Sequence, residues 1–191
     1  MLTQNEHIII WKRESVDTTT IETLRLIKVY NDYSIKSIVN GTLAGKPLLI
    51  EYRISIDKTW NVKTVEIESK LNDSLKISLK TDSIGKWFNN DNQEIKELNG
   101  CIDIDITITP FTNTLPIRRL GSILKNRTKI NVLYFDISSW SFKKVQQYYT
   151  MLDSNLYKYE GAFRNFTANL PTDNYGFVTS YPNLFKRIYP N

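Results

Sequence analysis

The sequence predicts a mainly β fold with a small helical part, and three observations carry that prediction. Apolar and polar residues alternate along many short segments, turn-forming residues separate those segments, and the composition is that of a folded globular protein. The chain has 191 residues, of which 41% are apolar and 24% are charged, close to the usual values for globular domains. Because no linker or internal repeat interrupts it, we expect a single domain over residues 1–191.

The clearest predicted strand lies at residues 48–57. Apolar side chains occupy every second position from Leu48 to Ile56, and Glu51, Arg53, Ser55 and Asp57 face the other way, which is the pattern of a strand with one buried face. The same alternation runs through Leu75–Lys80 and Ile102–Thr109. Further candidate strands are Thr23–Tyr30, Tyr33–Thr42, Val62–Glu68, Ile130–Ile137, Gln146–Leu152, Tyr157–Phe163, Phe166–Leu170 and Phe177–Ser180.

Turn-forming residues stand between these segments, at Asn31–Asp32, Ala44–Pro47, Asn72–Asp73 and Asp173–Gly176. Many short strands at close spacing indicate a mostly antiparallel meander. A sheet of roughly ten strands or more must curl, close or split, because long flat open sheets are unusual. The segment Gly41–Lys46 has three residues between its glycines rather than the four of a phosphate-binding loop, and Pro47 follows it. We therefore interpret it as a hairpin turn.

Helical signals are few. Thr112–Leu120 is the best candidate, because a Thr or Asn can cap it, Pro116 is tolerated in a first turn, and Gly121 can end it. Val145–Leu152 also has apolar residues at helical spacing, but we favour a strand there.

The charge pattern argues against a nucleic-acid partner. The 25 Lys and Arg residues exceed the 20 Asp and Glu residues by five, and they are scattered rather than clustered beside aromatic residues as in nucleic-acid binders. No apolar run approaches the ~20 residues of a membrane helix, and Ile8–Ile10 is shorter than the ~7–15 apolar residues of a signal peptide. We expect no transmembrane segment and a cytoplasmic location, and no feature indicates an oligomeric state.

Metal and cofactor chemistry is not expected. The single cysteine, Cys101, excludes an internal disulfide and a Cys-rich zinc site, and the single histidine, His7, excludes ligation by a pair of histidines. We interpret both residues as structural.

Asp103 and Asp105 are the most suggestive polar pair. They are two positions apart on a predicted strand, so their side chains share a face at ~7 Å spacing. Such carboxylates can act as general acid and base or bind the hydroxyls of a sugar, and the alternative is a solvated outer face. Arg118 and Arg119 follow closely and can neutralise them, which would lower the carboxyl pKa values and argue against proton transfer.

Trp60 and Trp87 each follow a polar, turn-like segment. Indole rings suit both sugar stacking and contact with lipid chains, and the alternative for both residues is packing in the core.

A resemblance to a known family covers nearly the whole chain, from about Trp11 to Arg187. The segments Gly100–Asp105 and Pro110–Leu120, the latter containing Thr-Asn-Thr-Leu-Pro-Ile-Arg-Arg-Leu, closely resemble the bacterial putative glycolipid-binding family. Other family-like pieces occur in order: Tyr52 with Asp57 and Trp60, Asp82 with Gly85 and Trp87, Gln147–Tyr149, Tyr157–Tyr159, Asp173 with Gly176 and Val178, and Tyr181–Arg187. One departure is Val62–Lys63, where the family tends to carry Thr-Arg; the loss of the planar Arg group weakens any anion-binding role there.

The resemblance implies an antiparallel sheet curled into a barrel-like shape around a central helical segment, similar to bacterial lipoprotein carriers of lipids. It also implies a glycolipid or another amphipathic small molecule as ligand. The ligand-binding residues expected on this basis are Tyr52, Trp60 and Trp87 along an apolar cavity, and Asp103, Asp105, Thr112, Asn113, Arg118 and Arg119 around a polar head group.

Our leading hypothesis is thus non-catalytic binding of an amphipathic ligand, with no catalytic residue. One alternative is an enzyme that acts on a glycosyl or ester bond with Asp103 and Asp105 as acid and base. A second is a structural or interaction protein whose helix fills the interior, so that the aspartates and arginines form a buried polar network between helix and sheet.

Overall fold

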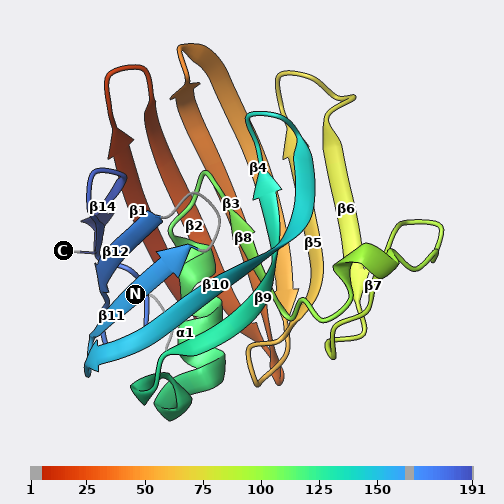
Figure 1. Cartoon of the computed structure of the whole chain (residues 1–191). Helices are drawn as coiled ribbons and strands as arrows, with labels where there is room; N and C mark the ends of the chain where they lie inside the picture. The colour runs from red at the N-terminus through yellow and green to blue at the C-terminus, as the bar shows by residue number, and fades with distance from the viewer. Residues whose placement is uncertain (1–5, 162–165, 191) are drawn as a thin grey trace.

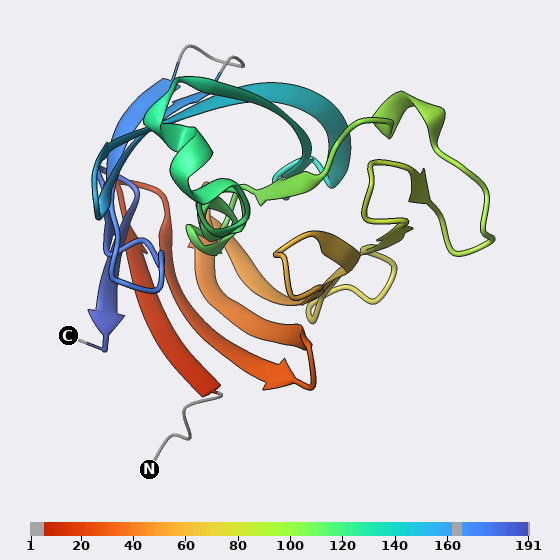
Figure 2. The ribbon, with the colours of Figure 1, turned by 90° about the horizontal axis from the view of Figure 1, so that it is seen from below.

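The computed structural model describes residues 6–161 and 166–190 and shows a mainly β protein made of two sheets (Figure 1). The first, sheet A, has the strand order β13-β14-β1-β2-β3-β4-β5-β6-β7, and the second, sheet B, has the order β12-β11-β10-β9-β8. In the described part of the chain neither sheet closes on itself. Both sheets curve around a short helix, α1 (Thr114–Leu120), which lies between them (Figure 2).

The strands of sheet A are β1 (Glu6–Glu14), β2 (Thr19–Val29), β3 (Asp32–Leu43), β4 (Lys46–Ile56), β5 (Val62–Ser69), β6 (Lys76–Thr81), β7 (Trp87–Phe88), β13 (Ser180–Tyr181) and β14 (Phe185–Tyr189). Those of sheet B are β8 (Asp103–Ile106), β9 (Thr128–Asp136), β10 (Ser141–Asp153), β11 (Leu156–Gly161) and β12 (Phe166–Pro171). The strand pairs are antiparallel except for β8 and β9, which are parallel. The mainly β, largely antiparallel prediction is confirmed, and the many-stranded sheet is split in two.

Most predicted strands lie where the alternation placed them. The helical alternative for Val145–Leu152 is wrong, because this segment belongs to β10 and its residues pair with both β9 and β11. In Phe177–Ser180, Ser180 belongs to strand β13 and Val178 forms a single bridge to Thr172. Positions 162 and 163 of the predicted strand Tyr157–Phe163 lie outside the described residues.

The segment Gly41–Lys46 forms the hairpin between β3 and β4, as predicted. Ala44 and Gly45 at its tip have φ values of 49° and 73°, the left-handed conformation that tight hairpin turns require. Gly41 has a φ of 143° and lies so close to β2 that a Cβ atom there would be 2.0 Å from the Thr19 carbonyl oxygen. This position therefore needs glycine.

The helix fills the middle of the space between the sheets. A 3₁₀ turn, Phe111–Asn113, leads into α1, Pro116 lies in its first turn, and Gly121 ends it with a φ of 51°, close to the prediction. Phe111 and Leu115 pack in a core cluster formed mainly by sheet A together with residues of β8 and β9, whereas Ile117 packs in a second cluster formed mainly by strands β9 to β12. The helix is thus buried between two apolar clusters. No helix in the described residues is long and apolar enough to cross a membrane.

Candidate functional site

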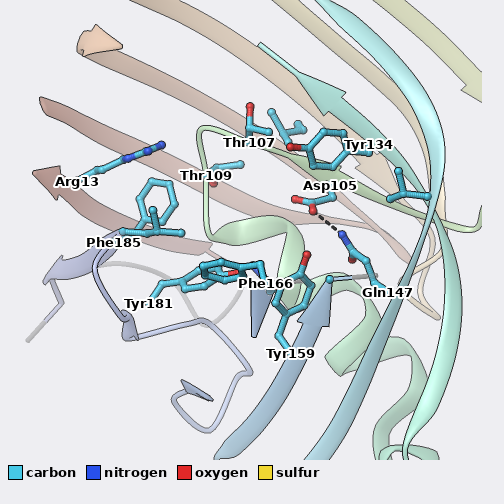
Figure 3. Close-up of a pocket in the computed structure, with 15 residues that line it drawn as sticks. Arg13, Asp105, Thr107, Thr109, Tyr134, Gln147, Tyr159, Phe166, Tyr181 and Phe185 are labelled. Carbon is cyan, nitrogen blue, oxygen red and sulfur yellow. Dashed lines mark hydrogen bonds between the residues drawn. The ribbon is translucent and has the colours of Figure 1, made fainter. Parts of the chain in front are cut away.

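A pocket of about 300 Å³ remains between the two sheets, beside the turn that leads into α1. We call it the Arg13 pocket. Its polar lining comes from Arg13, Asp105, Thr107, Thr109, Asn113, Tyr134 and Gln147, and its aromatic lining from Tyr159, Phe166, Tyr181 and Phe185. Arg13 enters from one side, and Asp105 and Gln147 lie on the other (Figure 3).

Strand alternation aims the polar side chains inward. On β1, Ile9 and Trp11 are buried and Arg13 continues the same face. On β10, Gln147 lies between the buried residues Val145 and Tyr149 on one face, and it is itself 3% exposed. Polar residues at inward positions of two different sheets therefore meet in one space.

Asp105 is held by neutral partners. Gln147 Nε2 donates a hydrogen bond to Oδ2 at 2.6 Å, and the Thr112 hydroxyl donates to Oδ1 at 3.4 Å. Burial raises the pKa of Asp105, and the two hydrogen bonds oppose that rise. Asp105 can accept further hydrogen bonds from the hydroxyls of a ligand.

Asp103, unlike Asp105, is paired with a charged residue. Arg119 donates to both of its carboxylate oxygens, from Nε at 3.1 Å and from Nη2 at 2.5 Å, and the carboxylate is 1% exposed. The expectation of lowered carboxyl pKa values is wrong, since burial raises the pKa of Asp103 despite Arg119. The alternative of a solvated outer face is also wrong, because the second face of β8 packs against α1 and β10 rather than solvent.

The two carboxylates are therefore not equivalent. Asp105 lines the Arg13 pocket, whereas Asp103 is paired away from it. Arg119 and Thr112 connect the helical segment to β8, as expected for a structural protein with a buried polar network between helix and sheet. The helix does not fill the interior, however, because the Arg13 pocket remains beside that network.

The apolar side of the pocket is a cluster of aromatic rings. Tyr159, Phe166 and Tyr181 lie with their ring centroids 5.8–6.2 Å apart, and Tyr181 contacts Phe185 at 6.2 Å. Phe166 is 38% exposed and Leu184 is half-buried. Such a wall suits a sugar face or an alkyl chain.

Two of the predicted residues meet at a different place. Trp60 and Arg118 line a second pocket, of about 180 Å³, together with His7, Lys28, Tyr33 and Tyr175. We call it the Trp60 pocket. The exposed Arg118 guanidinium stacks on the Trp60 ring at 4.9 Å from its centroid. Desolvation lowers the pKa of His7 in this cluster.

Tyr52 and Trp87 are core residues, each 0% exposed. Trp87 Nε1 donates to the carbonyl of Cys101 at 2.9 Å, and Cys101 is buried, which raises the pKa of its thiol to about 11. The Tyr52 hydroxyl donates to Glu22. These two aromatic residues line neither pocket.

Glu22 is the centre of a buried polar cluster under the pocket wall. The hydroxyls of Ser37 and Thr109 donate to its Oε1 at 2.8 and 2.9 Å, in addition to that of Tyr52. Its Oε2 has no hydrogen-bond partner among the described residues. Burial raises the pKa of Glu22 to about 7, although these three hydrogen bonds oppose the rise.

Of the predicted site residues, Asp105 and Asn113 line the Arg13 pocket, and Thr112 supports Asp105. Asn113 accepts a hydrogen bond from the Tyr149 hydroxyl at 2.8 Å. Sequence reasoning missed Arg13 and Gln147. The signal for Arg13 was the alternation of Ile9, Trp11 and Arg13, which places a charge on the inward face of a strand.

A family model and a solved structure are similar to this chain. The family model described as "Putative glycolipid-binding" matches residues 8–187. A crystal structure of a DUF1089 family protein from Pseudomonas aeruginosa is 32% identical and superposes with a TM-score of 0.75, over 87% of this chain and 92% of that one. The comparison with curated proteins gives no match.

Proposed function

The chain belongs to the family described as putative glycolipid-binding, and from that membership we propose that it binds a glycolipid or another amphipathic molecule in the Arg13 pocket without catalysing a reaction. The observation that carries the proposal is the composition of that pocket. Hydrogen-bonding groups that include Asp105 and Gln147 line one part of it, and a cluster of aromatic rings lines another part. This combination suits a molecule that is polar at one end and apolar at the other.

The size of the pocket limits what enters it. About 300 Å³ is at the lower end of the ~300–1,000 Å³ typical of ligand pockets. It has room for one sugar head group or part of one alkyl chain, and not for a whole lipid with two chains. We propose that the head group lies beside Asp105 and Gln147, while the chain runs out over Phe166, Leu184 and Phe185.

We propose that the two sheets together form one barrel-like enclosure around α1. Leu115 and Ile117 pack in two separate apolar clusters, so we propose that the helix holds the two sheets apart and keeps the pocket beside it open.

A glycosyl- or ester-cleaving enzyme has less support. That mechanism requires two carboxyl groups open to one shared pocket. Asp103 is instead paired with Arg119 and does not line the pocket that Asp105 lines.

Isothermal titration with octyl glucoside, below its micellar concentration, tests the proposal on the full chain. We expect saturable binding that is weakened by Leu184→Trp, because the larger side chain fills the half-buried rim. Leu184→Ala, which removes part of the apolar contact without blocking the rim, should weaken binding much less than Leu184→Trp. Native mass spectrometry of the purified protein should also detect a co-purifying amphiphile. Absence of both a saturable titration and a co-purifying amphiphile would overturn the proposal.

A further inference from the structure

Arg13 is an inward-facing cation that forms no ion pair with any carboxylate in residues 6–161 and 166–190. Its Nε is buried and has no hydrogen-bond partner among the described residues. Its guanidinium lies over the Phe185 ring, 5.5 Å from the centroid, and the side chain points into the pocket (Figure 3). A buried polar group that lacks a hydrogen-bond partner destabilises the folded protein, so the free protein keeps an unsatisfied donor at this pocket.

The other arginines show how unusual this is. The partly buried Arg119 and Arg187 pair with Asp103 and Asp173, each at 2.5 Å. The more exposed Arg25, Arg53 and Arg127 also have carboxylate partners. In the part of the chain that the structure describes, the arginines without an ion pair are Arg13 and Arg118, and Arg118 is solvated and stacked on Trp60.

The surroundings of Arg13 do not compensate its charge. Its neighbours on the outer face of β1, Lys12 and Glu14, pair with each other at 2.6 Å. Asp17 is near enough to affect the pKa of Arg13, but within the described residues it forms no ion pair with Arg13, and its carboxylate accepts a hydrogen bond from Thr18. The carboxylate of Asp105, in the same pocket, is bound by Gln147 and Thr112.

We propose that the ligand is an acidic amphiphile, whose phosphate or carboxylate group is bound by Arg13 while its hydroxyl groups donate to Asp105. This inference rests on the proposed function and narrows it from amphiphiles in general to those with an anionic group. Opposite charges on opposite walls orient the ligand, because Asp105 repels the acidic group that Arg13 attracts. The guanidinium presents several donors in one plane, which matches the oxygens of a phosphate or carboxylate.

The decisive experiment compares octyl phosphate, octyl glucoside and inorganic phosphate by titration calorimetry. The proteins are the full chain, Arg13→Met, Arg13→Lys and the control Lys12→Met, which removes one positive charge from the outer face of the same strand. We expect Arg13→Met to weaken octyl phosphate binding about tenfold to a hundredfold, as for loss of a charged hydrogen bond, and to change octyl glucoside binding less than about threefold. Arg13→Lys should retain part of the affinity, and Lys12→Met all of it.

Thermal unfolding of Arg13→Met gives an independent measurement. Because Arg13 has an unpaired buried nitrogen in the free protein, this variant should unfold at the same or a higher temperature than the parent chain. A large fall in the unfolding temperature would mean that Arg13 is structural and would overturn the inference.

The titrations also separate this inference from the proposed function. If octyl glucoside binds, and the parent chain and Arg13→Met bind octyl phosphate with equal affinity, then the role of Arg13 is overturned and the proposed function still stands. If inorganic phosphate binds as tightly as octyl phosphate, the apolar chain contributes no affinity. The proposal of an amphipathic ligand is then overturned, and the pocket is a site for a free anion. If the parent chain binds neither octyl compound, the proposed function fails and this inference fails with it.

Discussion

The guanidinium of Arg119 donates to both carboxylate oxygens of Asp103, which ties α1 to the edge strand β8 of sheet B. Two positions further along β8, Asp105 has no arginine and faces a pocket instead. The same strand thus carries one carboxylate that holds the fold together and one that is available to a ligand.

Removal of either partner of the Asp103–Arg119 pair should strongly destabilise the protein. Arg119→Met leaves Asp103 buried without its counter-charge, and breaking such a pair costs about 3–5 kcal/mol. The double variant Asp103→Leu with Arg119→Met should recover much of that loss, because neither charge is then buried alone. Urea unfolding of the parent chain and the two variants measures the effect, and equal stability of Arg119→Met and the parent chain would contradict it.

Glu22 should make stability fall as the pH rises. Its pKa is about 7 in the folded protein, against an ordinary value of 4.5 in the unfolded chain. The folded state therefore binds more protons between these pH values, and the contribution of Glu22 to stability is fully present below pH 4.5 and lost as the pH rises through about 7. A difference of this size corresponds to roughly 3 kcal/mol. Glu22→Gln keeps an oxygen acceptor for Tyr52, Ser37 and Thr109 and should remove this pH dependence. Urea unfolding of both proteins at several pH values around neutrality tests this, and parallel pH profiles would refute it.

Gly41→Ala should destabilise the sheet far more than the same change at Gly45. A Cβ at Gly41 would be 2.0 Å from the Thr19 carbonyl oxygen, whereas nothing lies within 4 Å of a Cβ at Gly45. We expect a loss of about 2–4 kcal/mol for Gly41→Ala and about 1 kcal/mol for Gly45→Ala, whose positive φ alone causes strain. Thermal or urea unfolding compares the two, and similar losses would show that the approach of β2 to Gly41 is not rigid.

Asp105→Asn should weaken octyl glucoside binding about fivefold to tenfold. A hydroxyl of the ligand then donates to a neutral oxygen rather than a carboxylate, and the charged hydrogen bond is the stronger by about 1 kcal/mol. The control is Glu97→Gln, which neutralises an exposed carboxylate on a separate 3₁₀ turn. Titration calorimetry measures both, and an unchanged affinity for Asp105→Asn would place the sugar elsewhere.

Sequence alternation predicted most strands because each long strand has one face in the core. Residues 48–57 are an example, where Ile50, Tyr52 and Ile54 are all buried. The strands β1, β7 and β14 were not predicted. In β1 the three consecutive isoleucines Ile8–Ile10 break the alternation, and the charged Arg13 continues the buried face of Ile9 and Trp11. The alternation in β8 could not show whether the face with Asp103 and Asp105 is solvated or buried. A period of two separates the two faces of a strand but does not say what covers each face.

By itself, the sequence determined the mainly β class, the hairpin at Gly41–Lys46 and the helix that ends at Gly121, and it marked Asp105 as a candidate site residue. These features depend on local periodicity and turn chemistry, which act over a few residues. Only the tertiary structure decided that Arg119 pairs with Asp103, that Arg118 and Trp60 form a separate pocket, and that Arg13 lies opposite Asp105. Those relationships join strands and helices far apart in the chain, and they depend on how two sheets pack around α1. Side-chain pairing across that space is a property of the packing, which no local pattern encodes.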